Sequence, residues 1–367
     1  MSNRLSLLIF FIIAISSLDN LIPGVRYLKY CVPFICLVYW LSNKSLYVYI
    51  PAATKPFLAL FLLSIPTLPF ANTYGLEDLF FYLTALSPFL FVGNLKLNPK
   101  IAFYILCIIY TANIMPKVIS SGFYYSFMDS SSAFEHHTYA FVFGVFAAYF
   151  ISTKNSRMLL ICLIFCALSL KRVSILALMI VYALSILPKG YLKYLLKPWR
   201  MVIINLLSIF VTYFVTTSIF NDLCIEYFDR SASFITMGRN VLYGSMFGEF
   251  FLQPHTFLIG VGLGETYTLA SESIEFSTKV NIHNDITKIF VESGILIFIL
   301  FFYYLYKVNS NQLLMVVYLN IVFFTDNVTT YVLVMYVFFY LMQTLQSKTL
   351  NTKPASCPNS VPTAIGQ

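Results

Sequence analysis

The apolar residues of this chain fall into successive blocks of roughly 15 to 23 residues, close to the about 20 that a helix needs to cross a membrane. Blocks such as 101–115 and 173–187 are apolar on every side, whereas a strand of a membrane barrel alternates apolar and polar positions. Inside hydrocarbon, only helices and closed barrels satisfy all backbone polar groups. The pattern therefore predicts an all-α, polytopic integral membrane protein.

Short polar segments divide the apolar blocks into about twelve expected membrane-spanning helices. These spans are expected at residues 5–20, 27–43, 56–71, 79–94, 101–116, 137–153, 157–171, 173–188, 200–220, 284–306, 311–325 and 329–346. About eleven would result if 157–171 and 173–188 form one broken helix. The expected organisation is a first group of spans within 1–220, a large outer loop at 221–283, further spans within 284–346 and a flexible tail at 347–367.

Composition supports this interpretation, and charge orients the chain. The residues are 59% hydrophobic and only 10% charged, against about 25% charged in soluble proteins. With both termini in the cytoplasm, most of the 23 lysines and arginines face the cytoplasm, as the positive-inside rule requires. All 15 acids then fall at or near the outer side. The seven cysteines show neither a disulfide framework nor metal-ligand spacing, so no metal site is expected.

The segment 221–283 is much longer than the other connections, and polar loops of that length are usually functional or disordered. Its glycines, aromatic residues and apolar runs argue against disorder. Apolar positions at helical spacing predict a helix near the membrane surface over 231–251. The glycine-rich stretch 258–264 lacks the preceding strand of a nucleotide-binding unit, so it predicts tight turns or a close backbone approach to a substrate.

Arginines on the outer side run against the topological bias and are candidates for binding an anion. Arg172 interrupts two apolar helices, where an uncompensated charge costs several kcal/mol, and its guanidinium suits phosphate oxygens. The alternative is an interfacial arginine that extends to water. Arg239 lies on the expected surface helix, where an ordinary ion pair with an acid of the same loop is the alternative. Arg230 is a weaker candidate, for substrate binding.

His283 stands where the large loop re-enters the membrane, in the sequence Asn-Ile-His-Asn-Asp. A histidine there can act as a base or donate hydrogen bonds near neutral pH. Glu292, about two and a half turns deeper, is a buried ionisable group that needs a partner, and it is the second candidate base or a support for His283. The alternative is a capping cluster in which Asn284 or Asp285 caps the helix and His283 is incidental.

His136 and His137 open another span on the same outer face. Adjacent residues of a helix point in different directions, so the two histidines are not expected to share a metal ion. Both are possible contacts for a sugar or a phosphate. Asn284 is a further candidate for binding substrate.

The order of these features carries a resemblance that no single motif carries alone. An arginine between two helices is followed by Gly-Arg, then by Pro-x-x-x-x-Ile-Gly-Val-Gly-Leu-Gly, and then by His-Asn leading to Glu-x-Gly in the next span. This order, over roughly residues 169 to 296, resembles the O-antigen ligase and polymerase superfamily. Two departures are Lys171 before Arg172, where the family often has a small residue, and the lack of a second glycine soon after Gly294.

The resemblance implies a metal-independent, cofactor-free glycosyltransferase in the bacterial inner membrane with a periplasmic active site. Its donor and its acceptor would both be undecaprenyl-diphosphate-linked oligosaccharides, and it would work within membrane lipid. A chain-length regulator and a flippase are possible partners, and no nucleic acid is expected to bind. Arg172 and Arg239 would then stabilise charge on the leaving diphosphate. His283 would orient or deprotonate the acceptor hydroxyl.

Three functions remain open at the level of sequence. A polymerase would join repeat units to one another, whereas a ligase would transfer the same glycan to the lipid A core. The richness in aromatic residues, 37 Phe and 27 Tyr, favours a polymerase. A transporter or a flippase of lipid-linked glycans would place ionisable groups near the bilayer midplane within repeated halves, whereas here they gather at one face.

Overall fold

The computed structural model describes residues 2–18, 21–43, 50–66, 72–93, 95–122, 136–252, 254–273 and 281–351. These residues form helices and turns, with no strand among them, so the predicted all-α class is confirmed. Of the expected flexible tail, residues 347–351 are the end of a helix, and residues 352–367 lie outside the described residues.

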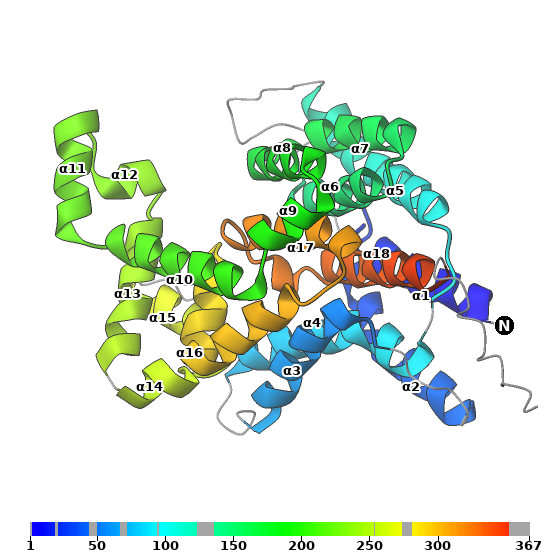
Figure 1. Ribbon diagram of the computed structural model, residues 1–367, viewed down its shortest axis with the longest axis horizontal. Helices are drawn as coiled ribbons and strands as arrows, with labels where there is room; N and C mark the ends of the chain where they lie inside the picture. Colours follow the sequence, from blue (N-terminus) through cyan, green and yellow to red (C-terminus); the bar gives the residue numbers. More distant parts are fainter. Residues whose placement is uncertain are drawn as a thin grey trace, which may run out of the picture.

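The helices follow one another closely along the chain (Figure 1). The first half contains α1 (Ser2–Ile15), η1 (Val25–Cys31), α2 (Val32–Ser42), η2 (Ala52–Thr54), α3 (Lys55–Ser64), α4 (Thr73–Ser87), η4 (Pro88–Val92), α5 (Pro99–Ser121), α6 (His137–Ser152), α7 (Ser156–Leu168) and α8 (Arg172–Ile186). The second half contains α9 (Lys189–Leu195), α10 (Pro198–Phe214), α11 (Ser218–Phe228), α12 (Ala232–Thr236), α13 (Arg239–Leu252), α14 (Pro254–Ile259), α15 (Glu265–Ser273), α16 (Asp285–Leu305), α17 (Ser310–Phe323), η5 (Val328–Thr330) and α18 (Val332–Asn351).

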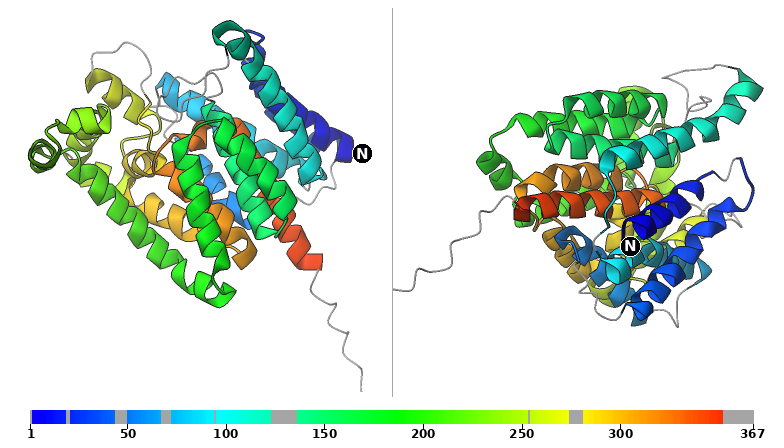
Figure 2. Two further views of the ribbon diagram at one scale, coloured as in Figure 1. Left: turned by 90° about the horizontal axis from the view of Figure 1, so that it is seen from above. Right: turned by 90° about the vertical axis from the view of Figure 1, so that its right-hand side faces the viewer.

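The helices pack in three layers, which the right-hand view of Figure 2 separates best. The pair α17 and α18 forms the middle layer, with α5 to α8 on one side and α1 to α4 together with α16 on the other. Almost every residue of α6, α17 and the first part of α18 is buried. Gly144 of α6 allows the closest approach, because a Cβ there would lie 1.8 Å from the Tyr318 hydroxyl of α17.

Within the described residues, three helices are long and apolar enough to cross a membrane: Thr73–Val92, Pro99–Ser120 and Asp285–Leu305. A fourth results if α9 and α10, which are bent by 48°, form one span. Other expected spans are shorter apolar helices of 10 to 17 residues, among them α6, α7 and α8. Three full-length spans, or four with the bent pair, are therefore present among the described helices.

The turn between α7 and α8 makes a helical hairpin, so the two expected spans 157–171 and 173–188 are separate helices and not one broken helix. The backbone of Leu170 takes a left-handed φ of 54° at this turn. Cys166 of α7 then lies beside Ser174 of α8, with 3.3 Å between their Sγ and Oγ atoms.

The predicted large loop is built mainly of helices, α11 to α15, wherever the structure describes it. The helix expected over 231–251 is present as two pieces, α12 and α13, with a break at Met237 and Gly238. The expected span 200–220 ends at Phe214, and α11 leads away from the bundle at the left of Figure 1.

Candidate functional site

A cavity of about 380 Å³ lies where the end of α10, the start of α13 and the start of α16 meet. Arg239 and Tyr243 of α13 line it, together with Thr212 of α10 and Asn284, the N-cap of α16. Burial raises the pKa of the Tyr243 phenol, and the charge of Arg239 and a hydrogen bond with Asn284 partly offset that rise. The cavity therefore combines a guanidinium, a phenol and an amide.

The break between α12 and α13 places Arg239 at this cavity. Met237 and Gly238 have left-handed φ values of 54° and 79°, a conformation that glycine adopts readily and methionine does not. The Thr236 hydroxyl bridges the break, because it accepts the Asn240 backbone N–H at 3.3 Å and donates to the Asn240 side chain at 2.9 Å. Arg239 is thus the first residue of α13, and it does not lie within a single helix continuous with α12.

His283 sits directly before the N-cap of α16, and its side chain is 38% exposed. Its backbone has a left-handed φ of 52°, which is uncommon for a residue with a side chain. Its Nδ1 lies 3.3 Å from Oδ1 of Asp326. Asn284 caps the helix by accepting the Thr287 backbone N–H at 3.0 Å, so the cap and the oriented histidine coexist.

Asp326 follows α17 and is the centre of a polar cluster. Its carboxylate accepts hydrogen bonds from the Tyr331 hydroxyl at 2.9 Å and from the backbone N–H of Asn327 at 2.9 Å. Lys171 reaches its other oxygen at 3.0 Å. Burial would raise the pKa of Asp326, but the hydrogen bond from His283 and the charge of Lys171 outweigh burial and hold the pKa below its usual value. Asp326 is therefore ionised at neutral pH.

Lys171 connects this cluster to the turn between α7 and α8. It is the N-cap of α8, and its Nζ lies 2.9 Å from Nδ1 of His137 as well as beside Asp326. An ammonium only donates, so Nδ1 of His137 accepts. Arg172, the first residue of α8, is exposed at the same end of the hairpin. The structure thus gathers His137 and Arg172 near the cluster, with Lys171 as the cation that contacts its carboxylate.

His136 and Arg230, two other candidates, have different surroundings. The side-chain amide of Asn113 lies 3.0 Å from Nε2 of His136, which joins α5 to the start of α6. Burial, together with the charges of His137 and Lys117, lowers the pKa of His136 to about 4, so the ring is neutral at pH 7. Arg230 stacks on Phe234 at 4.9 Å, in the turn between α11 and α12. Neither residue lines the Arg239 cavity.

Glu292 belongs to a second cluster, which is sealed inside the fold. Lys288, one turn before it on α16, pairs with Asp78 of α4, donates to the Tyr267 hydroxyl at 3.0 Å and lies 3.9 Å from Glu292. Glu292 itself accepts a hydrogen bond from Thr266. The expectation that Glu292 supports His283 is therefore corrected, because the described contact of His283 is with Asp326.

The glycine-rich stretch closes this buried cluster by packing on the kink of α16. The kink lies at Gly294, whose φ is 72°. The carbonyls of Val291 and Glu292 accept the backbone N–H groups of Val261 and Gly262, at 2.9 and 3.1 Å. A Cβ at Gly260 would lie 2.2 Å from the Glu292 carbonyl oxygen, so only glycine fits. The stretch thus makes its close backbone approach to α16, whereas the sequence suggests tight turns or an approach to a substrate.

The sequence patterns did not single out four residues of these clusters: Lys171, Asp326, Lys288 and Asp78. Two signals pointed to them: Lys288 stands four residues before Glu292 in one apolar helix, and Asp326 interrupts two apolar blocks. The pairing of Lys171 with Asp326 joins residues 155 positions apart and has no local signature.

Within the described residues, no group of three or more His, Cys, Asp or Glu side chains is arranged to hold a metal ion. No known family model, characterised protein or solved structure is significantly similar to this chain. The geometry of the two clusters is therefore the basis for a functional proposal.

Proposed function

We propose that this chain is an integral-membrane glycosyltransferase, an O-antigen polymerase, that joins polyprenyl-diphosphate-linked oligosaccharide repeat units. The observation that carries the proposal is that Asn284, which lines the Arg239 cavity, directly follows the partly exposed His283, which a buried carboxylate orients. The cavity thus offers a cation for a leaving diphosphate, and a candidate base precedes one of its lining residues. Such an arrangement suits the transfer of a glycan from a phosphate-linked donor.

His283 would accept the proton of the acceptor sugar. Because a carboxylate only accepts, Nδ1 of His283 donates to Asp326, and Nε2 keeps its lone pair when the ring is neutral. The acceptor hydroxyl oxygen forms a bond to the anomeric carbon of the donor while the bond from that carbon to the diphosphate oxygen breaks. The proton passes to Nε2, and the electron pair leaves with the diphosphate.

Arg239 and the cations of the α7–α8 turn would bind the diphosphate. Arg239 lines the cavity, whereas Lys171 and Arg172 stand at the start of α8. Pre-positioned cations stabilise the charge that develops on a leaving group, by about 3 to 4 kcal/mol for one donor. Since Asp326 already neutralises Lys171, we assign the principal role to Arg239, with Arg172 in support.

A second cavity, of about 480 Å³, offers room for the polyprenyl chain. It is lined by the apolar and aromatic side chains Leu206, Ile209, Phe210, Tyr213, Phe251, Phe257, Phe290 and Ile295. Both cavities lie along α10 and α13. The apolar one is lined by α10 residues from Leu206 to Tyr213, and the Arg239 cavity by residues from Val211 to Val215 at the end of α10. An amphiphilic donor would therefore have a polar end at Arg239 and an apolar end along α10.

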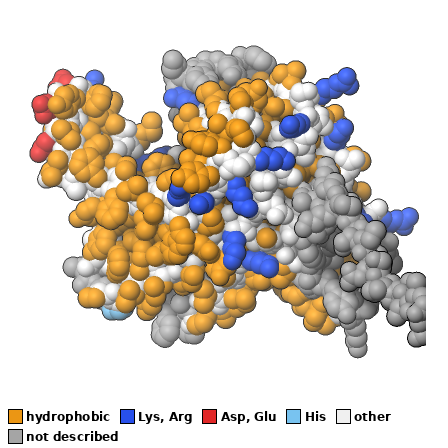
Figure 3. Space-filling view, viewed as in Figure 1, with side chains coloured by type: hydrophobic (Ala, Val, Ile, Leu, Met, Phe, Trp, Pro, Cys, Tyr) orange, Lys and Arg blue, Asp and Glu red, His pale blue; other side chains and the backbone are white. Residues whose placement is uncertain are grey.

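The proposal places the helices in the bacterial inner membrane, with twelve spans once α2 and the shorter apolar helices are included and with the Arg239 cavity facing the periplasm. Hydrophobic side chains cover much of the visible face of α10, α11 and α13, as expected for a lipid-facing surface (Figure 3). Basic residues at the ends of the helices opposite to the cavity agree with a cytoplasmic location there.

One observation favours a transporter as the second candidate. Lys288, Asp78 and Glu292 form a buried ionisable cluster beside the kink of α16, and transporters place coupling groups beside broken helices. The glycine-rich stretch packs on this kink through backbone hydrogen bonds. We therefore prefer a structural role for this cluster. A ligase would use the same donor chemistry and differs only in its acceptor.

The banding pattern of lipopolysaccharide tests the proposal directly. A strain lacking the gene would be complemented with the wild type, Arg239→Ala, Arg172→Ala or His283→Ala, and Arg157→Ala, an exposed arginine at the start of α7, is the control. We expect a core carrying a single repeat unit in the deletion strain, and a full ladder only with the wild type and the control. Bare core in the deletion strain would support a ligase, and an unchanged ladder would refute glycan transfer altogether.

A further inference from the structure

A basic cavity lies at the opposite end of the bundle from the Arg239 cavity. The Arg239 cavity adjoins the end of α10 and the start of α16. The basic cavity adjoins the start of α10, the end of α16 and the start of α17. Since α16 has 21 residues, the two sites are separated by about 30 Å of helix. The basic cavity is therefore no part of the proposed active site.

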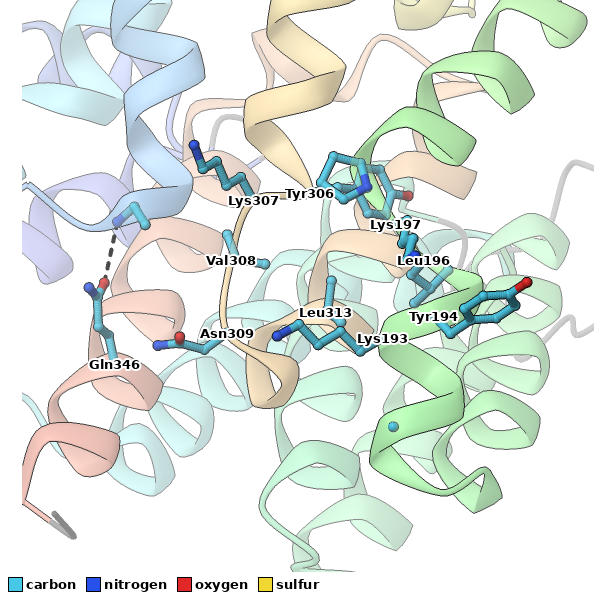
Figure 4. Close-up of a pocket in the computed structure, with 13 residues that line it drawn as sticks. Lys193, Tyr194, Leu196, Lys197, Tyr306, Lys307, Val308, Asn309, Leu313 and Gln346 are labelled. Atoms are coloured by element: carbon cyan, nitrogen blue, oxygen red, sulfur yellow. Dashed lines mark hydrogen bonds between the residues drawn. The ribbon is translucent and has the colours of Figure 1, made fainter.

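Lysines from two sides surround this cavity of about 510 Å³ (Figure 4). Lys193 and Lys197 come from α9 and the turn after it, and Lys307 follows α16. None of the three forms a salt bridge with a carboxylate of the described residues. The sequence explains why, because it has no Asp or Glu at positions 136–221 or 293–325. The positive charge of the cavity is left uncompensated.

Neutral hydrogen-bonding groups accompany the lysines. Tyr306 lines the cavity and is only 2% exposed, and its hydroxyl has no hydrogen-bond partner within the described structure. An unsatisfied buried hydroxyl is costly, so a ligand that accepts a hydrogen bond from it would bind more tightly. The amides of Asn309 and Gln346 also line the cavity, although Gln346 already accepts the backbone N–H of Ala52 at 3.3 Å.

The start of α10 adds a further positive element. Its N-cap, Lys197, makes no side-chain cap hydrogen bond, so the first N–H groups of this 17-residue helix lack that partner. Uncapped N–H groups and the helix dipole both favour an anion. Pro198 at the first helical position and Leu196 provide apolar surface beside these groups.

We propose that this cavity binds a phosphate group, carried by the headgroup of an anionic phospholipid or present as a free ion. Three lysines without a carboxylate partner, a hydroxyl donor and a helix N-terminus match the oxygens of a phosphate, although Lys197 and Lys307 also lie over tyrosine rings. The apolar walls at Leu196, Val308 and Leu313 match the glycerol and acyl portion of a lipid. In Figure 3, basic side chains gather over the middle of the visible face, whereas acidic side chains are visible only at α11. Basic pockets at the cytoplasmic side of helical membrane proteins bind such lipids.

The test measures the thermal stability of the detergent-solubilised full chain with increasing dioleoylphosphatidylglycerol, dioleoylphosphatidylcholine or inorganic phosphate. We expect saturable stabilisation by phosphatidylglycerol and not by phosphatidylcholine. The variant Lys193→Gln/Lys197→Gln/Lys307→Gln should weaken the apparent affinity on the order of 100-fold, since each lysine near an anionic lipid contributes about 1 kcal/mol. Stabilisation by phosphate alone at millimolar concentration would support the site with a free ion as its ligand.

A matched variant, Lys100→Gln/Lys154→Gln/Arg157→Gln, removes three positive charges from exposed positions outside the cavity and should leave the affinity unchanged. Tyr306→Phe sharpens the result, because it deletes one buried hydroxyl. It should raise the melting temperature without ligand and weaken phosphatidylglycerol binding about tenfold. Equal losses in the cavity variant and the matched variant, or equal stabilisation by both lipids, would overturn the proposal. The assay needs no glycan transfer, so its failure is independent of the proposed enzyme activity.

Discussion

The two clusters at the start of α16 contain the same kinds of side chain and differ in how far they are closed. Lys288 is 1% exposed and is enclosed by Asp78, Glu292 and Tyr267, with backbone packed over the kink beyond it. His283 is 38% exposed and contacts one buried carboxylate, and the next residue, Asn284, lines a cavity that also contains Arg239. A sealed set of opposite charges stabilises a fold, whereas an open and unbalanced set can accept a ligand.

The largest effect should come from breaking the sealed cluster. Lys288→Met leaves two buried carboxylates without their cation, and losing one partner of a buried pair costs about 3 to 5 kcal/mol. We expect little folded protein, measured as the monodisperse fraction in detergent and as melting temperature. The double variant Asp78→Asn/Lys288→Met should recover much of the stability and should retain glycan transfer. A folded but inactive double variant would favour the transporter, whose coupling groups these would be.

The next effect concerns the close backbone packing, here called the interlock, of the glycine-rich stretch 258–264 against α16. Gly260→Ala places a Cβ 2.2 Å from the Glu292 carbonyl at a backbone φ of +85°, so we expect a destabilisation of about 2 to 3 kcal/mol. Gly248→Ala in α13 is the control, because nothing lies within 4 Å of its added Cβ, and it should be neutral or slightly stabilising. Similar melting temperatures for both variants would argue against the interlock.

A smaller effect should follow in the open cluster from Asp326→Asn. An amide holds His283 less well than a carboxylate, so we expect kcat to fall about tenfold with little change in KM. Because its folded pKa lies below the usual value, Asp326 contributes stability that is fully present above its unfolded pKa of about 3.9 and is lost only at lower pH. The melting temperatures of the wild type and of Asp326→Asn should therefore differ by a constant amount between about pH 5 and 8. A change in KM alone would show that Asp326 affects binding and not the position of the base.

The last effect, on the pH dependence of stability, concerns His136. Its folded pKa of about 4 lies below its unfolded value, so the unfolded chain binds more protons between about pH 6.5 and 4. The stability of the wild type should therefore fall on acidification through this window, by about 3 kcal/mol. His136→Asn should remove that part of the slope in a series of melting curves. If the pH dependence of the melting temperature is unchanged in His136→Asn, other groups cause it.

The sequence was sufficient for the helical class, because apolar blocks are local patterns. It also singled out Arg239 and Asn284, which line one cavity, whereas the catalytic role of His283 stays a prediction. It was insufficient for pairings such as Lys171 with Asp326 and Lys288 with Asp78, which tertiary packing creates. Helix lengths were overestimated at α7 and α8, because hydropathy does not register the left-handed turn at Leu170. Glu292 had the expected need for a partner, and Lys288 on the same helix supplies a cation.

The most direct test of the account is the rate at which the purified full chain extends polyprenyl-diphosphate-linked repeat units when the guanidinium in the cavity is removed. Arg239→Gln and the exposed control Arg157→Gln should have the melting temperature of the wild type. We expect kcat for Arg239→Gln to fall on the order of 100-fold, the loss typical of one pre-positioned donor to a leaving group, and the control to be unchanged. An Arg239→Gln variant that extends repeat units at the wild-type rate would contradict the assignment of chemistry to the open cluster.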